Sequence, residues 1–118
     1  MLEQPDAANL LATAREVLLK DLLPHLPEPQ KFQARMVANA MAIAARETGA
    51  DPAPPLAELR HVLAEPASAP EDLLRRLAAE IRAGQHDPGT PRHAAVAGAL
   101  AGLVRLRCTV SAPKALGR

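Results

Sequence analysis

Three polar residues on one expected helix have the types and the spacing to bind an anion. Arg35, Asn39 and Arg46 are separated by four and seven residues, which places them along one edge of a helix. Two guanidinium groups beside an amide can hold a carboxylate or a phosphate through paired hydrogen bonds. The same residues also suit a structural network, in which Asp21 of the preceding helix pairs with Arg35 and Asn39 completes the hydrogen bonding. The sequence leaves three interpretations open: an anion-binding site, a polar network that fixes the register of two helices, or side chains that are simply exposed to solvent.

The histidines predict neither a metal site nor a catalytic centre. No two of them have the four-residue spacing of a helical metal pair, and no Cys–His spacing resembles zinc ligation. We expect them in loops or at helix ends, in contact with solvent. His61 and His93 could serve as general bases, but no nucleophile motif supports that role. Phosphate-binding glycine loops and dinucleotide fingerprints are also missing, so we expect no catalytic residue, no metal and no cofactor. The four histidines are His25, His61, His86 and His93.

The segment 32–47, which carries both arginines, is predicted to be the central helix of the fold. It is apolar on two sides, and such a helix is either central in a bundle or part of an interface. The stripe expected to face the core consists of Phe32, Met36 and Ile43. The second strip, a candidate interface, consists of Val37, Met41 and Ala44. Together with a core almost free of aromatic residues, this second strip favours a homo-oligomer, most simply a dimer.

Twelve prolines and six glycines divide the chain into periodic segments and short loops. We predict helices at about 5–23, 29–48, 56–64, 68–83 and 90–109, the fourth opened by a capping box at Ser68. Strand signals are nearly absent. The predicted fold is therefore all-α, a single-domain bundle of four to five helices joined by Pro/Gly-rich loops over residues 1–110. Residues 111–118 are expected to form an extended C-terminal tail.

Composition narrows the possible partners and the compartment. The 118 residues include one Phe, no Tyr and no Trp, and the formal net charge is +1. Such a weak field, without aromatic residues to stack on bases, argues against nucleic acid and membrane partners. We expect no apolar run long enough to span a bilayer and no secretory signal at the acidic N-terminus. A single cysteine excludes an internal disulfide framework, so we expect a cytoplasmic protein.

Several sequence patterns extend over most of the chain. One is Phe32-x-x-Arg35-x-x-x-Asn39-Ala40-x-x-Ile43-x-x-Arg46-Glu47, preceded by Leu10-Leu11, Arg15-Glu16 and Leu22-Leu23-Pro24. Another is Leu77-Ala78-Ala79-Glu80-Ile81-Arg82-Ala83-Gly84, and Ala112-Pro113-Lys114 follows near the end. In these patterns the chain resembles a family of short uncharacterised bacterial all-helical proteins. Members of that family tend to be encoded beside acyl-CoA dehydrogenases and aminoglycoside-phosphotransferase-like kinases, so the resemblance implies an association with acyl-CoA metabolism.

Two functions follow as hypotheses. The first is a non-catalytic helical module that self-associates and binds a protein partner, with an acyl-CoA-metabolising enzyme as the partner that the resemblance implies. The chain is too short to hold a flavin-binding dehydrogenase fold, so the resemblance implies no dehydrogenase activity. The second hypothesis is a small-ligand binder or enzyme that uses Arg35, Asn39 and Arg46 around a phosphate or a carboxylate.

Overall fold

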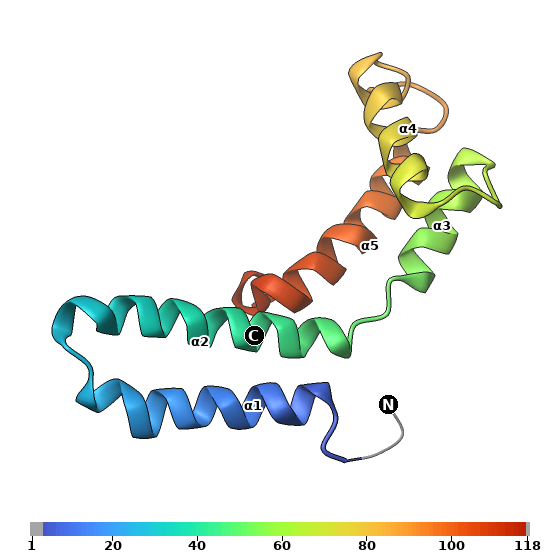
Figure 1. The fold of residues 1–118 in the computed structure, drawn as a ribbon. Coiled ribbons are helices and arrows are strands. Elements are labelled where there is room, and N and C mark those ends of the chain that lie inside the picture. Colours follow the sequence, from blue (N-terminus) through green and yellow to red (C-terminus); the bar gives the residue numbers. More distant parts are fainter. Residues whose placement is uncertain (1–3, 118) are drawn as a thin grey trace. The chain divides into compact units, whose positions relative to one another are not determined.

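The computed structural model describes residues 4–117, and within them it contains helices and turns but no strand (Figure 1). The prediction of an all-α fold is therefore confirmed. Three shorter helical turns accompany the main helices: a π-helical turn at Leu18–Leu22 and 3₁₀ turns at Leu23–His25 and Pro113–Leu116. The α-helices are α1 Ala7–Val17, α2 Glu28–Thr48, α3 Ala53–Leu63, α4 Pro70–Arg82 and α5 His93–Ser111.

Residue contacts divide the chain into two compact units. The first contains the residues up to Ala50 together with those from Thr109 onward, and the second contains Asp51–Cys108. The sequence analysis expected one bundle over residues 1–110 instead. It also expected an extended tail over 111–118, but Pro113–Leu116 of that tail form a 3₁₀ turn. Proline fixes φ near the helical value and favours such a turn at its first position.

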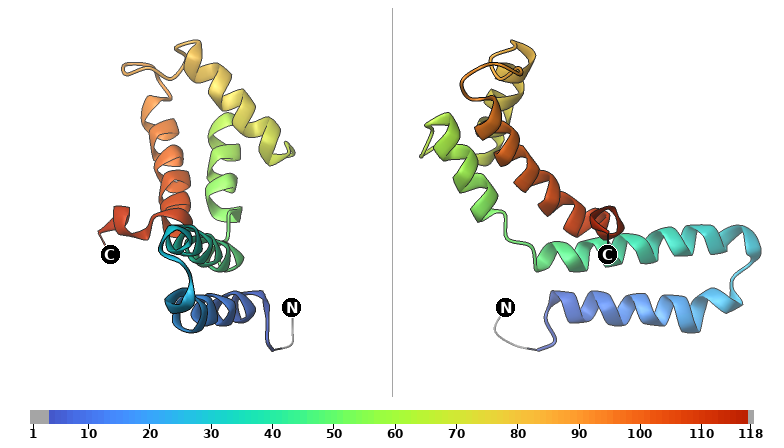
Figure 2. Two further views of the ribbon diagram at one scale, coloured as in Figure 1. Left: turned by 60° about the vertical axis from the view of Figure 1, so that its left-hand side comes forward. Right: turned by 180° about the vertical axis from the view of Figure 1, so that it is seen from behind.

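In the first unit, α1 and α2 form an antiparallel helical hairpin (Figures 1 and 2). α1 begins with a reciprocal capping box, in which Asp6 accepts from the Asn9 backbone and the Asn9 side chain accepts from the Asp6 backbone. The two buried residues of α2 are Ala34 and Ala38. Their small side chains allow the helices to approach closely, and Arg15 Nε of α1 donates to the Ala38 carbonyl at 3.2 Å.

The end of the first helix differs from the prediction of a regular helix through residue 23. After Val17 the backbone widens into a π-helical turn, in which the Leu23 N–H bonds the Leu18 carbonyl five residues earlier. Pro24 then lies in the 3₁₀ turn that leads to α2, because a proline cannot donate the hydrogen bond that would continue the helix. The wider turn rotates the residues that follow, so Asp21 does not have the angular position that a regular helix would give it.

The second unit packs α3, α4 and the first turns of α5 around a small aliphatic core. Its buried residues come in pairs, one pair from each helix, and all are leucine, valine or alanine. Leu59 and Ala99 are completely buried. Leu73 and Leu77 of α4 are buried at helical spacing, whereas Leu74 and Ile81 of the same helix are exposed. The full set is Leu59, Leu63, Leu73, Leu77, Val96 and Ala99.

α3 and α4 begin differently from the prediction. α3 starts at Ala53, so the prolines at 54 and 55 form part of its first turn. Backbone N–H groups in the first turn have no carbonyl partner within the helix, so the N–H that proline lacks costs no hydrogen bond there. The sequence analysis assigned these prolines to a loop. α4 starts at Pro70 without a side-chain cap. The predicted capping box at Ser68 is wrong, because the Ser68 hydroxyl donates to Glu65 Oε2 at 3.1 Å instead.

α5 is the one helix within residues 4–117 with the length and apolarity of a membrane span. It has 19 residues and a mean hydropathy of 1.3 over its most apolar window, whereas the sequence analysis expected no such segment. Two of its side chains, Val96 and Ala99, are buried in the core of the second unit. The core helix of a soluble protein passes the same test of length and composition, so α5 assigns the chain to no membrane.

Candidate functional site

The polar residues predicted to act together on α2 are not joined in the structure. Asp21, Arg35 and Asn39 are all exposed. No hydrogen bond or ion pair connects Asp21 to Arg35 in the part of the chain that the structure describes. The expected buried pair is therefore not formed. The physical reason is that α2 turns its alanine side toward α1, while the π-helical turn changes the direction of Asp21.

Arg46 has a different partner from the one predicted. Its Nε donates to the Val110 carbonyl at 2.6 Å, and the bond is partly buried. Both residues belong to the first unit, so the bond attaches the segment from Thr109 onward to the C-terminal half of α2. A guanidinium that donates to a main-chain carbonyl near the end of a helix has a structural role, because it satisfies that carbonyl and holds the two segments together. The candidate anion site therefore reduces to Arg35 and Asn39, one turn apart on the exposed edge of α2.

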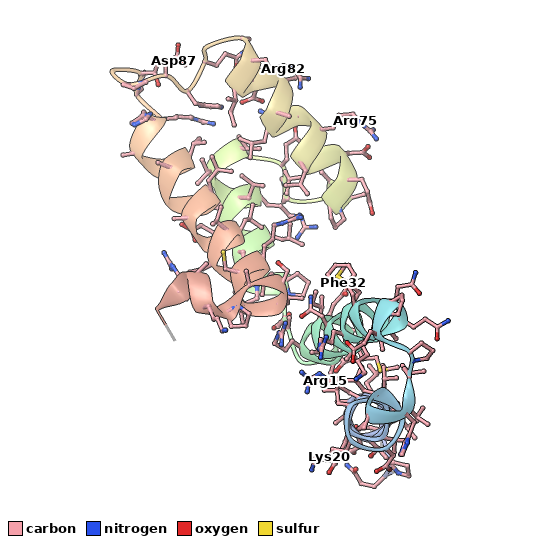
Figure 3. All side chains as sticks on the ribbon, turned by 90° about the vertical axis from the view of Figure 1, so that its left-hand side faces the viewer. Arg15, Lys20, Phe32, Arg75, Arg82 and Asp87 are labelled. Carbon is pink, nitrogen blue, oxygen red and sulfur yellow. The ribbon has the colours of Figure 1, made fainter. Side chains whose placement is uncertain are left out.

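Two apolar residues of α2 that were expected in the core are exposed, and one that was expected at the interface faces α1. Phe32 is 69% exposed and Met36 is 56% exposed, although both were expected in the core. Figure 3 shows Phe32 on the side of α2 away from α1. Val37, predicted as interface, is 49% exposed, whereas Met41 and Ala44 are half-buried. At 100° per residue, Met41 shares the side of the buried alanines, so it belongs with the contact to α1.

A continuous apolar surface on α2 results from this arrangement. Helical phasing places six apolar residues within one arc on the side away from the buried alanines. Four of them are exposed and two are half-buried. Exposed apolar surfaces of this kind mark interaction sites in soluble proteins. We call this surface the α2 outer face: Phe32, Met36, Val37, Ala40, Ile43 and Ala44.

A chain of charged side chains lies in the second unit, along α4 and the loops on either side of it. Arg76 of α4 donates to Glu65 Oε1 at 2.6 Å and also donates through Nε to Glu80. Glu80 Oε1 lies 2.8 Å from Nε2 of His86. The side chains of Glu80 and His86 are only 14% and 6% exposed. His93 Nδ1 lies 2.9 Å from the His86 carbonyl and donates to it.

The pKa of Glu80 is lowered, and three effects decide its direction. Burial alone would raise the pKa, because it disfavours the charged form. Hydrogen bonds from Arg76 and His86, with the charge interactions of both residues, outweigh that effect and hold the pKa below the ordinary value of 4.5. Glu80 is therefore an ionised acceptor at neutral pH. Because a carboxylate can only accept, the His86 nitrogen facing it, Nε2, carries a proton.

A pocket of about 130 Å³ lies beside these histidines. Its polar wall consists of His86, Asp87 and His93, from the loop after α4 and the start of α5. Figure 3 shows Asp87 in that loop. Its apolar wall is formed by Ile81, Val96, Ala97 and Leu100. We call this cavity the histidine pocket. Residues 4–117 contain no group of three His, Cys, Asp or Glu side chains arranged to hold a metal.

The sequence analysis missed Glu80 and His86 as members of a site. It considered His93 as a possible base and expected the other histidines in contact with solvent, but His86 is almost completely buried. Arg76 and Glu80 have the i,i+4 spacing of a helical ion pair, which was an available signal. It was obscured because Arg76 has a second acidic residue, Asp72, at the same spacing on its other side. In the structure Asp72 pairs with Arg75 instead, at 3.2 Å.

One family model matches the chain. It describes a domain of unknown function, DUF6285, and it matches residues 24–115, which include α2 to α5, the α2 outer face and the histidine pocket. No curated protein and no solved structure matches the chain. Because the match covers well over half of the 118 residues, the chain belongs to the DUF6285 family, a domain of unknown function.

Proposed function

We propose that this protein is a non-catalytic helical module that self-associates through the α2 outer face. The observation that carries the proposal is the exposure of Phe32, the only aromatic residue of the chain, at 69%. Aromatic and methionine side chains are enriched at protein interfaces, where they bury large areas at low entropic cost. Phe32 and Met36 are one turn apart on this face, so they offer a paired anchor to a second chain.

The dimensions of α2 support a second copy as the occupant. With 21 residues the helix is about 30 Å long, so two such helices packed face to face can form an extended contact. In the same arc, Ala40 and Ala44 allow close helix approach, and Ile43 adds apolar area. Arg35 and Asn39 border the face and supply the polar rim that such interfaces have. A two-fold arrangement would place the same residues of both chains in contact.

The direct test exchanges Phe32 for a polar residue of smaller size. Phe32→Ser should shift the monomer–dimer equilibrium toward monomer by at least about tenfold, since a central aromatic anchor contributes about 2 kcal/mol or more. Light scattering coupled to size-exclusion chromatography measures the mass. Val17→Ser is the matched control, because Val17 is an exposed apolar residue on α1, outside the α2 outer face. Equal effects of both substitutions would reject this face as the interface.

We also propose that the partner outside the homo-oligomer is an acyl-CoA-metabolising enzyme. The support is the resemblance to proteins encoded beside acyl-CoA dehydrogenases. Purified protein mixed with an acyl-CoA dehydrogenase of the same organism should elute as a complex of higher mass than either component. Phe32→Ser in the same mixture distinguishes whether the α2 outer face also binds the enzyme. Separate elution of the two wild-type proteins at micromolar concentration would reject this partner.

A second candidate function is the binding of a phosphate or carboxylate at the edge of α2. Arg35 and Asn39 are both exposed and one turn apart, which leaves their donors accessible. CoA esters and phosphorylated metabolites should then raise the melting temperature of the wild-type protein. Arg35→Ala should abolish that increase, while Arg75→Ala, which changes an exposed arginine of α4, should preserve it. A response that persists in Arg35→Ala would exclude this edge as the site.

A further inference from the structure

The histidine pocket contains polar groups that the proposed self-association does not use. His93 is half-buried at its rim, and its Nδ1–H donates to the His86 carbonyl at 2.9 Å. A carbonyl can only accept, so in the neutral ring the lone pair lies on Nε2. The structure gives His93 Nε2 no hydrogen-bond partner from residues 4–117. This nitrogen is therefore a hydrogen-bond acceptor held in a fixed orientation.

His86 is oriented in the complementary way. Its Nε2–H faces the ionised Glu80, so the lone pair of its neutral ring lies on Nδ1. Nδ1 is enclosed by protein and has no partner within the described residues. Buried polar atoms are nearly always hydrogen-bonded, and an exception calls for an explanation. A bound molecule that reaches Nδ1 after a small shift of the surrounding side chains would supply the missing donor.

The third polar group of the pocket wall has the same hydrogen-bonding character. Asp87 contributes a carboxylate, whose Oδ2 would lie 3.1 Å from a Cβ added at Gly84. Gly84 has φ of +77°, so the loop that carries Asp87 leaves α4 through a conformation that favours glycine. With both imidazole rings in their neutral form, the Asp87 carboxylate and the two imidazole lone pairs are all acceptors. They attract a donor and repel a carboxylate.

We infer that the histidine pocket binds a small molecule with a hydrogen-bond-donating head, an alcohol or a primary amine, on a short hydrocarbon chain. The head group bonds the acceptors of His93 and Asp87, and the chain lies against Ile81, Val96 and Leu100. A cavity of about 150 Å³ can hold benzene, so about 130 Å³ accommodates a chain of about four carbons. Neither the family match nor the proposed self-association assigns such a site.

Nuclear magnetic resonance on the full chain tests this inference with three probes of equal length. The probes are 1-butanol, n-butylamine and butyrate, at about pH 8, above the ordinary range of histidine titration. Long-range proton–nitrogen spectra should show the Nδ1–H tautomer for His93 and the Nε2–H tautomer for His86. At least one donor probe should shift the Ile81 and Val96 methyl signals saturably, with a dissociation constant on the order of 1 mM. Butyrate should bind at least tenfold more weakly.

Two substitutions on α5 separate this pocket from other surfaces. Ala97 and Ala95 are both exposed, but only Ala97 lines the pocket. Ala97→Phe should fill the cavity and weaken the donor probes at least tenfold, whereas Ala95→Phe should leave binding unchanged. Equal binding to wild type and Ala97→Phe would overturn the inference. Butyrate affinity equal to that of the donor probes, or no saturable shift with either donor, would also overturn it on the wild-type protein alone.

Discussion

At the scale of single residues, Glu80 shows how a nearly buried carboxylate stays charged. Burial opposes its ionisation, and Arg76 and His86 reverse that effect by hydrogen bonding to the ionised form. Arg76 also pairs with Glu65, so one guanidinium connects the loop before α4 to the C-terminal half of that helix. The Glu80 carboxylate orients His86, and the His86 carbonyl in turn orients His93.

Glu80→Gln tests this role through its pH dependence. Because the folded-state pKa of Glu80 is lowered, its stabilising contribution is present above the unfolded pKa, near 4.5, and is lost as pH falls through the folded value. Urea unfolding at pH 7 should show the variant less stable by about 1–3 kcal/mol, since hydrogen bonds to charged groups are the stronger ones. The difference should shrink toward pH 3. A pH-independent difference would mean that the substitution acts through packing.

Arg46 is the residue whose predicted and observed roles differ most. It was expected beside Arg35 in a polar network or an anion site, and it bonds the Val110 carbonyl. Arg46→Met keeps much of the aliphatic side chain and removes the donor, so it should destabilise the first unit by about 1–2 kcal/mol. Amide hydrogen exchange at residues 109–117 should increase. Unchanged exchange there would show that the bond contributes nothing measurable.

At the scale of elements, the alanine side of α2 decides how the hairpin packs. Ala38 is 2% exposed and Ala34 is 7% exposed, and both are buried on the α1 side. Close approach through small side chains lets Arg15 of α1 reach the Ala38 carbonyl. The larger apolar residues of α2 consequently lie outside this contact.

Ala38→Leu should therefore destabilise the hairpin. The added side chain has no space between the helices, and overpacking of this kind costs about 1–3 kcal/mol. Ala79→Leu is the control, because Ala79 is an exposed alanine of α4, outside the hairpin and the α2 outer face, and should change stability by less than about 0.5 kcal/mol. Chemical denaturation followed by circular dichroism measures both. Equal stabilities of the two variants would contradict the alanine contact.

The sequence predicted the positions of the helices better than it predicted which face of each helix is buried. Helical spacing, prolines and glycines were enough to place five helices, and the ends of α2 were correct to within one residue. The choice of buried face in α2 was wrong because hydrophobicity favoured Phe32 and Met36, whereas the contact selects small residues. The Asp21–Arg35 pair failed because a π-helical turn changes the phase and has no simple sequence signal. The Glu80–His86 pair depends on how a loop folds back, which spacing along one helix cannot predict.

At the scale of the whole molecule, the chain forms two units with separate buried clusters. The second unit depends on a core of leucines, valine and alanine, and its completely buried side chains include Leu59. A core this small contributes little to the free energy of unfolding, which is consistent with a protein that gains stability by association.

Leu59→Ala tests how far the units are independent. The substitution should destabilise the second unit by about 2–5 kcal/mol, because it leaves a cavity in a closed core. Hydrogen exchange should increase across α3, α4 and the first turns of α5 and remain near the wild-type rate in α1 and α2, which pack through other residues. An equal increase throughout the chain would show that the two units unfold together.

The proposed interface, the α2 outer face, holds two copies of the chain together. Sedimentation velocity of the wild-type protein between about 1 and 100 μM tests it most directly, since interfaces of ordinary size give dissociation constants in or below this range. The mass should rise with concentration from one chain to two, and Phe32→Ser should remain at one chain over the same range. A wild-type protein that sediments as a single chain at every concentration would contradict the claim.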